Sequence, residues 1–391
     1  MKNYIFLLLL ACLSSCTNEY YTEDITENKE GHEYIITKYG AIGDGENDCS
    51  TIINKLIEDL PPSGGVIVIP EGDFVLDSPI IVNKSFVTIR GLNTGMRSNI
   101  DVVDIHKLLG PGGGSKLILR RANTAILIPI MPNLGGLKNR ISGVEIKDLM
   151  ISGGASNNGI GIDVKYDNDR CRISNLIGIN LNYGIRVKSA DAMMIQDSWI
   201  CEVKNSIEMT DGIQNMISNC QLGAQPSGIT CKLVNQTNFL FTNNHIYPDG
   251  SKNLVLDNCE KINVTNNNFK SYYVGMLDIN GNHNLVNGNI FWLADIFKNQ
   301  LMGYNEDYGV IRVAGNFNML SSNIVVCNWN NLSIDPVTVY SLAGKGNSFA
   351  NLLIENQNST RVFLVNESAK IYNCVPVDKI KIERDENVNL E

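Results

Sequence analysis

Carboxylates are the side chains of this 391-residue sequence best suited to catalysis, because cysteine and histidine are not arranged for it. The ten cysteines form no CxxC pair, and no cluster of Cys and His has the spacing of a zinc site. A pair of Asp or Glu side chains, in contrast, can provide a general acid and a general base. We therefore look for catalytic residues among the 41 Asp and Glu.

Several of these carboxylates can be explained by a structural role, in a turn or an ion pair, as well as by a role in catalysis. Asp197 stands at a turn position where other segments of the chain carry Asn, which favours a role in the turn. Asp167 and Asp169 flank a turn next to two arginines and would form ordinary ion pairs with them. Glu208 lies on an alternating stretch, Ser-Ile-Glu-Met-Thr, and is kept as a reserve candidate for a catalytic carboxylate.

The composition indicates which elements must position such residues. The chain contains 51 Asn and 34 Gly, both of which are poor in helix interiors and common in tight turns. This composition argues against a helical bundle and predicts a chain of short strands and regular turns. The formal net charge of −9 argues against nucleic acid or an acidic membrane surface as the main partner.

A repeat organises the chain from about residue 144 onward. Short β-patterned runs are interrupted at one position by Asn, Asp, Ser or Ala, and from Asn175 to Asn287 the spacings are 22, 22, 24, 23 and 21 residues. The series consists of Asp148, Asn175, Asp197, Asn219, Asn243, Asn266, Asn287, Ser322 and Ala350. This period predicts an all-β solenoid, a single-stranded right-handed parallel β-helix. The repeated turn position would stack on itself, with side-chain amides forming an Asn ladder.

The two ends of the chain differ from the repeat. Residues 1–16 are typical of a lipoprotein signal ending in Leu-Ser-Ser-Cys, with Cys16 as the lipidated residue, and the alternative is an ordinary secretory signal. Residues 17–33 are a polar tether, and a helical stripe from Ser50 to Leu60 is expected to cap the first coil of a domain spanning 34–377. Residues 378–391 form a charged tail or a short last strand. The remaining cysteines are expected to be buried free thiols.

Two resemblances narrow the interpretation. Residues 39–91 resemble the first coils of the pectate-lyase-like β-helix superfamily, although no Gly-His-Gly or Asn-Thr-Asp turn of the pectin hydrolases is present. From about Pro70 to Trp329 the chain resembles the inulin fructotransferases of glycoside hydrolase family 91. The matching segments include Pro111-Gly-Gly-Gly-Ser-Lys, Gly161 to Asp169, Ser189-Ala-Asp-Ala, Leu222 to Gly228, Tyr273 to Leu277 and Asp307 to Gly315.

The resemblance implies two catalytic carboxylates, Asp191 in the Ser-Ala-Asp-Ala turn and Glu202 eleven residues later. It also implies a fructotransferase that releases a difructose dianhydride (III or I) from inulin without a metal or organic cofactor. Cleavage of the fructosyl bond passes through an oxocarbenium-like state that needs a general acid and a base. Lys188, Glu208, Gln221, Tyr272 and Tyr273 are predicted sugar contacts, because hydroxyl groups bind amides and charges while sugar ring faces bind aromatic rings.

The chain departs from the family pattern at two places. Ser227 stands where an acidic residue is expected, and the stretch from Phe291 to Glu306 is short. A dianhydride hydrolase on the same scaffold and a non-catalytic glycan-binding lipoprotein therefore remain alternatives. A polysaccharide lyase would need a calcium-binding carboxylate cluster, which we do not find in the sequence.

The expected assembly depends on the positions of the two carboxylates, and the expected location depends on the N-terminal signal. Asp191 and Glu202 are half a coil apart and could face in different directions on one chain. The resemblance implies a homotrimer with active sites between subunits. The protein is expected at the bacterial cell envelope, periplasmic or at the outer membrane, and bound to a membrane only through the lipid on Cys16.

Overall fold

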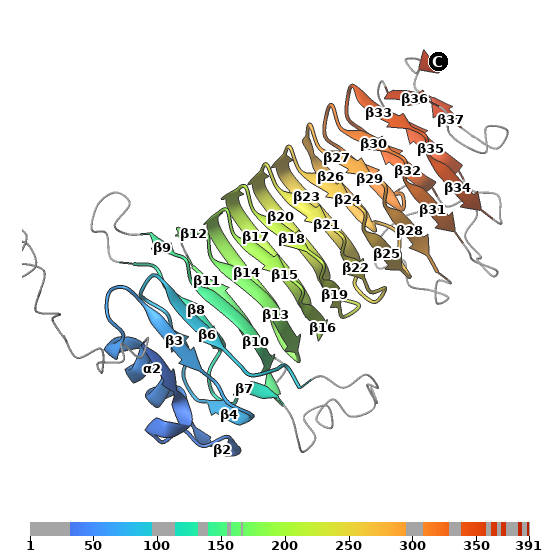
Figure 1. The fold of residues 1–391 in the computed structure, drawn as a ribbon. Helices are drawn as coiled ribbons and strands as arrows, with labels where there is room; N and C mark the ends of the chain where they lie inside the picture. The colour runs from blue at the N-terminus through green and yellow to red at the C-terminus, as the bar shows by residue number, and fades with distance from the viewer. Residues whose placement is uncertain are drawn as a thin grey trace, which may run out of the picture.

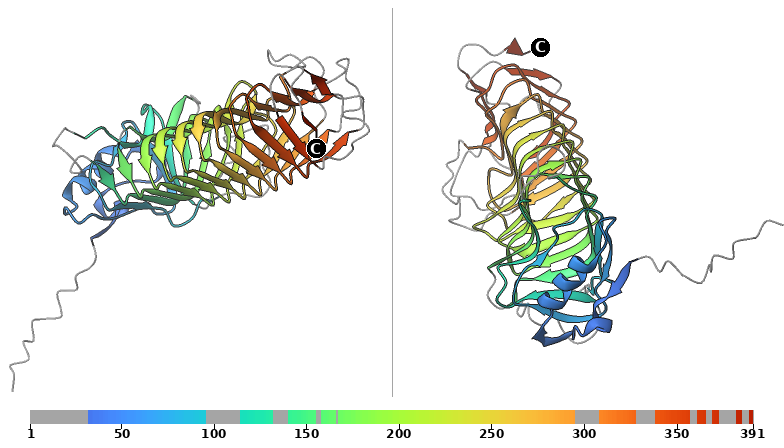
Figure 2. Two further views of the ribbon diagram at one scale, coloured as in Figure 1. Left: turned by 90° about the horizontal axis from the view of Figure 1, so that it is seen from above. Right: turned by 90° about the vertical axis from the view of Figure 1, so that its left-hand side faces the viewer.

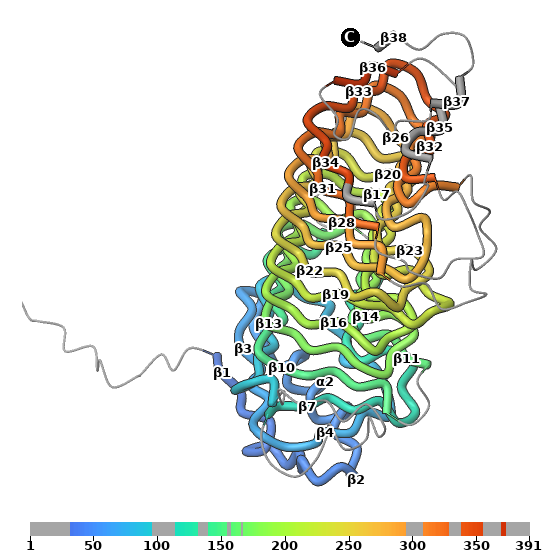
Figure 3. The backbone as a smooth tube through the Cα atoms, turned by 90° about the vertical axis from the view of Figure 1, so that its right-hand side faces the viewer, coloured from blue at the N-terminus to red at the C-terminus, as the bar shows by residue number. Residues whose placement is uncertain are grey.

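The computed structural model is a right-handed parallel β-helix, which confirms the predicted fold class (Figure 1). It describes residues 32–95, 114–131, 140–154, 158–165, 167–294, 308–327, 338–356, 361–365, 369–372, 382–384 and 389–390. Cys16 and nearly all of the predicted tether lie outside these residues. All strand pairings within the described ranges are parallel, and the strands form three stacks that run the length of the molecule (Figures 1 and 3).

The first stack is a 14-stranded sheet that contains the longest strands. Its strands are β5 (Ile80–Ile81), β8 (Thr124–Ile128), β11 (Gly159–Val164), β14 (Leu181–Asp191), β17 (Asn205–Ile213), β20 (Ile229–Thr237), β23 (Lys252–Glu260), β26 (Leu277–Asn282), β29 (Ile311–Val313), β32 (Thr338–Leu342), β35 (Arg361–Val365) and β37 (Ile382–Arg384). Two short strands, β9 (Ile141–Ser142) and β12 (Asn168–Asp169), extend this sheet beside the end of β14.

The second and third stacks together form a 24-stranded sheet. The second stack contains β1 (Glu33–Ile35), β3 (Gly65–Val68), β6 (Val87–Arg90), β10 (Glu145–Ser152), β13 (Arg172–Ile179), β15 (Met194–Gln196), β18 (Met216–Ser218), β21 (Leu240–Thr242), β24 (Asn263–Thr265), β27 (Leu285–Asn287), β30 (Met319–Ser321), β33 (Asn347–Ala350), β36 (Ala369–Tyr372) and β38 (Asn389–Leu390). The third contains β2 (Asp44–Asp48), β4 (Gly72–Leu76), β7 (Ser115–Leu119), β16 (Trp199–Val203), β19 (Gln221–Ala224), β22 (His245–Ile246), β25 (Asn268–Ser271), β28 (Ile290–Leu293), β31 (Ile324–Cys327) and β34 (Leu353–Asn356). Strands β10 and β13 run through both stacks.

The predicted turn series marks the corner between the second and third stacks. Asp148, Asn175 and Asp197 have φ near +55°, the left-handed conformation that Asn and Asp tolerate best among residues with a side chain. The prediction was wrong by one residue in two coils, because Gly288 and Asn351 occupy this position instead of Asn287 and Ala350. Side-chain pattern alone could not separate two adjacent residues that are both suited to a turn.

The Asn ladders lie mainly one residue beyond this corner, inside the solenoid. Asn244, Asn267, Asn289 and Asn323 are buried, and each of the first three donates from its amide to the amide oxygen of the next at 2.9–3.1 Å. A second ladder runs through Asn284, Asn318 and Asn347 at the corner between the first and second stacks. These bonds satisfy buried polar groups that would otherwise destabilise the coil. Much of the Asn content is therefore structural, as predicted.

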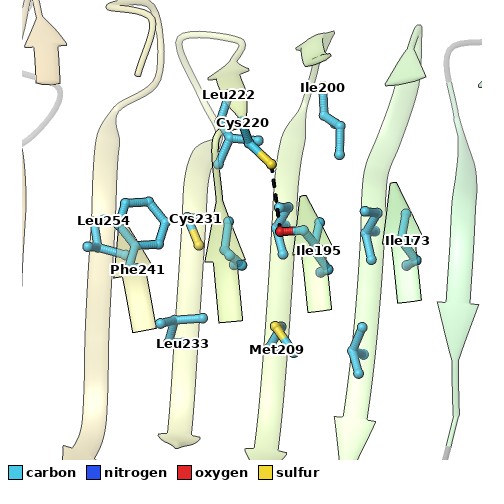
Figure 4. Close-up of a cluster of buried hydrophobic side chains, with 14 of the residues drawn as sticks. Ile173, Ile195, Ile200, Met209, Cys220, Leu222, Cys231, Leu233, Phe241 and Leu254 are labelled. Carbon is cyan, nitrogen blue, oxygen red and sulfur yellow. Dashed lines mark hydrogen bonds between the residues drawn. The ribbon is translucent and has the colours of Figure 1, made fainter. Parts of the chain in front are cut away.

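The interior of the solenoid is filled by apolar side chains that lie in register from one coil to the next, and the long strands of the first stack contribute several each. Figure 4 shows part of this core, in which Ile173 and Ile195 lie on the neighbouring strands β13 and β15 and Cys220 lies between β18 and β19. The rings of Phe241, Phe269 and Phe291 stack along the axis at centroid distances of 6.2 and 4.7 Å. Seven cysteines of the described chain are buried free thiols, which confirms that prediction for them. Cys374 lies outside the described residues.

The first coil is closed by the predicted helix. Helix α2 (Ser50–Asp59) buries Ile53, Leu56 and Ile57 against the core, and it lies at the N-terminal end of the solenoid (Figure 2). A short 3₁₀ helix, η1 (Ile36–Tyr39), precedes it. At the other end, β37 and β38 belong to residues 378–391 and pair with β35 and β36. Part of the charged segment therefore continues the sheets, in line with the short last strand that we considered.

Candidate active site

Glu202 occupies a bulge at the corner between the third and first stacks. The register between β16 and β19 shifts between Ile200 and Val203, so that Glu202 has no counterpart in the next coil. Its φ is +53°, and its backbone oxygen accepts a hydrogen bond from the Asn180 N–H at 3.1 Å. Asn180 is the residue of the preceding coil in the same left-handed conformation, which Asn adopts more readily than Glu. Bulges recur next to functional sites, and the register shift at Glu202 therefore makes it a functional candidate.

The surroundings of Glu202 favour the protonated form of its carboxyl group. Partial burial raises the pKa of Glu202, and the negative charge of Asp249 raises it further. Burial also raises the pKa of Asp249, although the positive charge of Lys270 opposes this effect. A carboxyl group that retains its proton is the form that a general acid requires.

Asp249 was not among the residues predicted from the sequence. It lies in the turn Pro248-Asp249-Gly250 between β22 and β23, and Pro-Asp-Gly is an ordinary turn signal. The sequence therefore gave no reason to assign it a role. Only the folding of two later coils brings its charge within electrostatic reach of Glu202.

Polar and aromatic side chains lie along the third stack in the coils that follow Glu202. Gln221 is exposed, and its side-chain oxygen accepts a hydrogen bond from the Tyr247 hydroxyl at 2.9 Å. The Lys270 ammonium lies 4.4 Å from the ring centroid of Trp292 and 5.9 Å from that of Tyr272. Exposed rings beside amides and a cation are suited to sugar recognition.

The two predicted tyrosines differ in accessibility. Tyr272 is half-buried, whereas Tyr273 is only 3% exposed and presents little of its ring to a ligand. Burial raises the pKa of both hydroxyl groups, and the charge of Asp249 contributes in each case. Both tyrosines therefore lie near Asp249, in the same part of the corner. Ser227, the departure from the family pattern, is exposed in the turn that follows β19 in this corner.

Asp191 lies at the opposite end of the first stack, as the last residue of β14. The Arg140 guanidinium donates to Oδ2 of Asp191 at 3.2 Å and to Oδ1 of Asp167 at 2.8 Å. Burial alone would lower the pKa of Arg140, but the charges of Asp167 and Asp191 outweigh it and raise the pKa. Arg140 thus remains a cation that binds both carboxylates, and the sequence had not indicated it.

The structure does not bring Asp191 and Glu202 together on one chain. Glu202 is aligned with Asn180, immediately before β14 begins, and Asp191 is where β14 ends. The nine residue steps from Asn180 to the bend at Ser189 correspond to about 25 Å or more of extended chain. Two carboxyl groups that act on one glycosidic bond lie within about 5–10 Å of each other. The two carboxylates of a single chain therefore cannot act on the same bond.

The other predicted residues of the first stack lie between these ends. Lys188 is exposed on β14, three residues before Asp191. Glu208 is half-buried on β17, where it is paired in register with Arg186 near the middle of the strand. Asp169 forms an ion pair with Arg170 at 3.0 Å, and Asp197 adopts the left-handed corner conformation, as their structural interpretations predict.

Two structural features are absent from the described residues. In this part of the chain, no group of three or more His, Cys, Asp or Glu side chains is arranged to hold a metal ion. The same residues include no helix that is long and apolar enough to cross a membrane.

Comparison with known proteins supports the resemblances found in the motifs. Residues 35–98 match the family "Rhamnogalacturonase A/epimerase, pectate lyase-like". An inulin fructotransferase (DFA-I-forming) from Arthrobacter globiformis is 27% identical over 316 residues, which cover 74% of this chain and 79% of the relative. This similarity confirms the predicted resemblance to inulin fructotransferases, which are enzymes.

Solved structures of the DFA-IIIase from Arthrobacter chlorophenolicus A6 have the same fold. Its complex with DFA-III has a TM-score of 0.73 and 22% identity, covering 90% of this chain and 98% of the relative. The same protein without its lid, in complex with GF2, has a TM-score of 0.79 and 23% identity over 92% of this chain and 99% of the relative. These similarities confirm the β-helix fold over nearly the whole described solenoid.

Proposed function

We propose that this protein is a fructan-degrading inulin fructotransferase. It would cleave terminal difructosyl units of inulin by intramolecular fructosyl transfer and release a difructose dianhydride (III or I). The observation that supports this proposal best is the contrast between its two carboxyl groups. Glu202 is partly buried near the negative charge of Asp249, whereas Asp191 is ion-paired with Arg140. Different environments divide two carboxyl groups into an acid and a base.

The proposed reaction exchanges one bond for another within the substrate. The protonated Glu202 donates its proton to the glycosidic oxygen as the bond from the fructosyl C2 to that oxygen breaks. A hydroxyl group of the neighbouring fructose then attacks C2, and the Asp191 carboxylate accepts its proton. The oxocarbenium-like state between the two steps is stabilised by nearby negative charge. Because the attacking group belongs to the substrate, no water molecule is consumed.

The distance between the two carboxylates of one chain supports the proposal of an active site shared between subunits. We propose a homotrimer in which Glu202 of one subunit and Asp191 of its neighbour line the same cleft. The extended first stack supports this proposal, because it holds Asp191 and Glu202 at opposite ends and leaves each free for a different neighbour. Gln221, Tyr272 and Lys270 would contact sugar on the Glu202 side, and Lys188 on the Asp191 side.

Product analysis tests the proposed activity. The purified protein is incubated with inulin, levan and difructose dianhydrides, and the products are separated. A cyclic difructose released from inulin is the expected result. Opening of added dianhydride with water, in the absence of its formation, would instead establish the hydrolase alternative. Binding of fructan without any product would establish the non-catalytic alternative.

We also propose that Cys16 carries a lipid that anchors the protein at the bacterial cell envelope. The apolar run ending in Leu-Ser-Ser-Cys supports this proposal, and the polar residues 17–33 would hold the domain away from the membrane. A Cys16→Ala form should be released from the membrane fraction of cells. If that form stays membrane-bound, the lipid anchor is refuted.

A further inference from the structure

A cavity of about 280 Å³ lies on the outer face of the first stack, over β8, β11 and β14. It is lined by polar side chains around an apolar floor that includes Leu127 and Ile160. Its volume is near the lower end of the range for small-molecule sites, roughly 300–1,000 Å³. The cavity is therefore of a size for one sugar unit rather than for an oligosaccharide.

One wall of the cavity contains the Asp163 carboxylate, which is only 2% exposed. Arg186 donates to it twice, from Nε to Oδ1 at 3.1 Å and from Nη2 to Oδ2 at 2.8 Å. The Lys165 ammonium lies 2.7 Å from Oδ2. Burial would raise the pKa of Asp163, but these two cations outweigh it and lower the pKa. The carboxylate is thus ionised and held in a fixed position.

Arg186 and Lys165 carry more N–H groups than Asp163 accepts. Arg186 has five N–H groups and Lys165 has three, of which Asp163 accepts two from the former and one from the latter. The amides of Asn123, Asn158 and Asn182 also line the cavity and can both donate and accept. Such an arrangement is complementary to the hydroxyl and ring oxygens of a sugar.

The charge of the cavity favours a neutral ligand over an anion. Two cations, Lys165 and Arg186, are balanced by Asp163 and by Glu208, which is paired in register with Arg186 on the next strand. The negative charge of Glu208 contributes to the raised pKa of Arg186, although the hydrogen bonds to Asp163 contribute most. With the formal charges cancelled, a neutral polyhydroxyl group is favoured over a carboxylate or phosphate.

The cavity adjoins the corner that carries Glu202. Asn182 stands two residues after Asn180, whose N–H group donates to the backbone oxygen of Glu202. The backbone oxygen of Leu181 accepts a hydrogen bond from Lys204, two residues after Glu202. A chain bound at Glu202 could therefore extend around this corner onto the first stack.

From this arrangement we propose that the cavity is a subsite for a sugar unit of the fructan chain beyond the two units that react. The assignment rests on the proposed function and adds a chain-length preference to it. Substrates long enough to fill the subsite gain hydrogen bonds that the shortest substrates cannot make. The subsite acts on binding and leaves the chemistry at Glu202 and Asp191 unchanged.

Lys165→Met tests the subsite, because it removes one donor of the cavity and keeps most of the side-chain volume. Lys147→Met is the matched control, since Lys147 also pairs with a carboxylate two residues earlier on a strand, at 2.9 Å, outside the cavity. Turnover of fructo-oligosaccharides of increasing length is measured for both variants and the unmodified protein. Lys165→Met should lower kcat/KM about tenfold for long substrates through KM, and leave the shortest unaffected.

Several results would overturn the subsite. An equal loss at every chain length, no loss at any length, or the same loss in Lys147→Met would each do so. Thermal unfolding of the variants identifies a folding defect, and in that case the exposed Asn158→Ala replaces Lys165→Met as the test. If the unmodified protein turns over no fructan, the proposed function fails. In that case, calorimetric titration with the same oligosaccharides tests the subsite separately from the reaction. The subsite is supported only if the affinity of the unmodified protein rises with chain length and Lys165→Met abolishes that rise.

Discussion

The protonation of Glu202 depends on a neighbour that is distant in sequence. Because burial and the charge of Asp249 both raise the pKa of Glu202, Asp249→Asn should lower it. A general acid is active below its pKa, so the alkaline limb of the profile of kcat/KM against pH should move to lower pH. The measurement is this profile with inulin as the substrate, for the variant and the unmodified protein.

Asp257→Asn is the matched control for this prediction. Asp257 lies on β23 and accepts a hydrogen bond from Asn280 on the outer face of the first stack, away from the corner of Glu202. Its substitution should leave the alkaline limb in place. An unchanged limb in Asp249→Asn would show that the charge of Asp249 does not control the acid group of the reaction.

Arg140 should hold the Asp191 carboxylate in position for the reaction. Arg140→Gln removes a charged hydrogen-bond partner, and kcat/KM is expected to fall about ten- to a hundredfold. Arg140→Lys should restore part of the activity because it keeps the charge. Arg170→Gln provides the control, since Arg170 pairs with Asp169 in the same region and its side chain is 78% exposed. Steady-state kinetics and thermal unfolding of all three variants separate a local effect on Asp191 from a loss of folded protein.

The Asn ladder determines how firmly successive coils are held together. The Asn267 side chain accepts from the Asn244 backbone and side chain and donates to the Phe241 oxygen and to Asn289. Asn267→Ala leaves several of these buried groups without partners, and each such group costs about 1–3 kcal/mol. The free energy of unfolding, measured with denaturant, should therefore fall by at least about 2 kcal/mol.

The neighbouring residue offers a control for the ladder. Asn268 follows Asn267 directly but is exposed on the outer face of the third stack. Asn268→Ala should change the free energy of unfolding by about 0.5 kcal/mol or less. Equal effects of the two substitutions would contradict the assignment of the stabilising bonds to the buried ladder.

The assembled trimer should be active and the isolated monomer inactive. If the active site combines Asp191 of one subunit with Glu202 of another, Asp191→Asn and Glu202→Gln subunits are each inactive alone. Refolding them together should restore part of the activity, because some interfaces then contain both intact carboxylates. Light scattering should show a trimer at working concentration, and dissociated monomers should be inactive. A fully active monomer is incompatible with the shared site.

The sequence alone predicted the architecture of this protein, which the structure confirms, and it supplied Asp191 and Glu202 as candidate catalytic residues. The spacing of turn residues predicted the solenoid, because each coil must repeat its corner at a fixed interval to stack on the one before. The apolar stripe from Ser50 to Leu60 predicted the capping helix, since burial of one helical face requires that period. Asp191 and Glu202 are predicted catalytic residues through a family resemblance that is carried by motifs local in the chain.

Only the tertiary structure decided what surrounds these residues. The charge of Asp249 reaches Glu202 across 47 residues of sequence, and Arg140 reaches Asp191 across 51. Neither partner carries a local signal, because an ion pair or a shifted pKa depends on distance in space. The bulge at Glu202 and the length of β14 also set the separation of the two carboxylates. Local sequence specifies each coil, whereas contacts between coils specify the environment in which a carboxyl group acts.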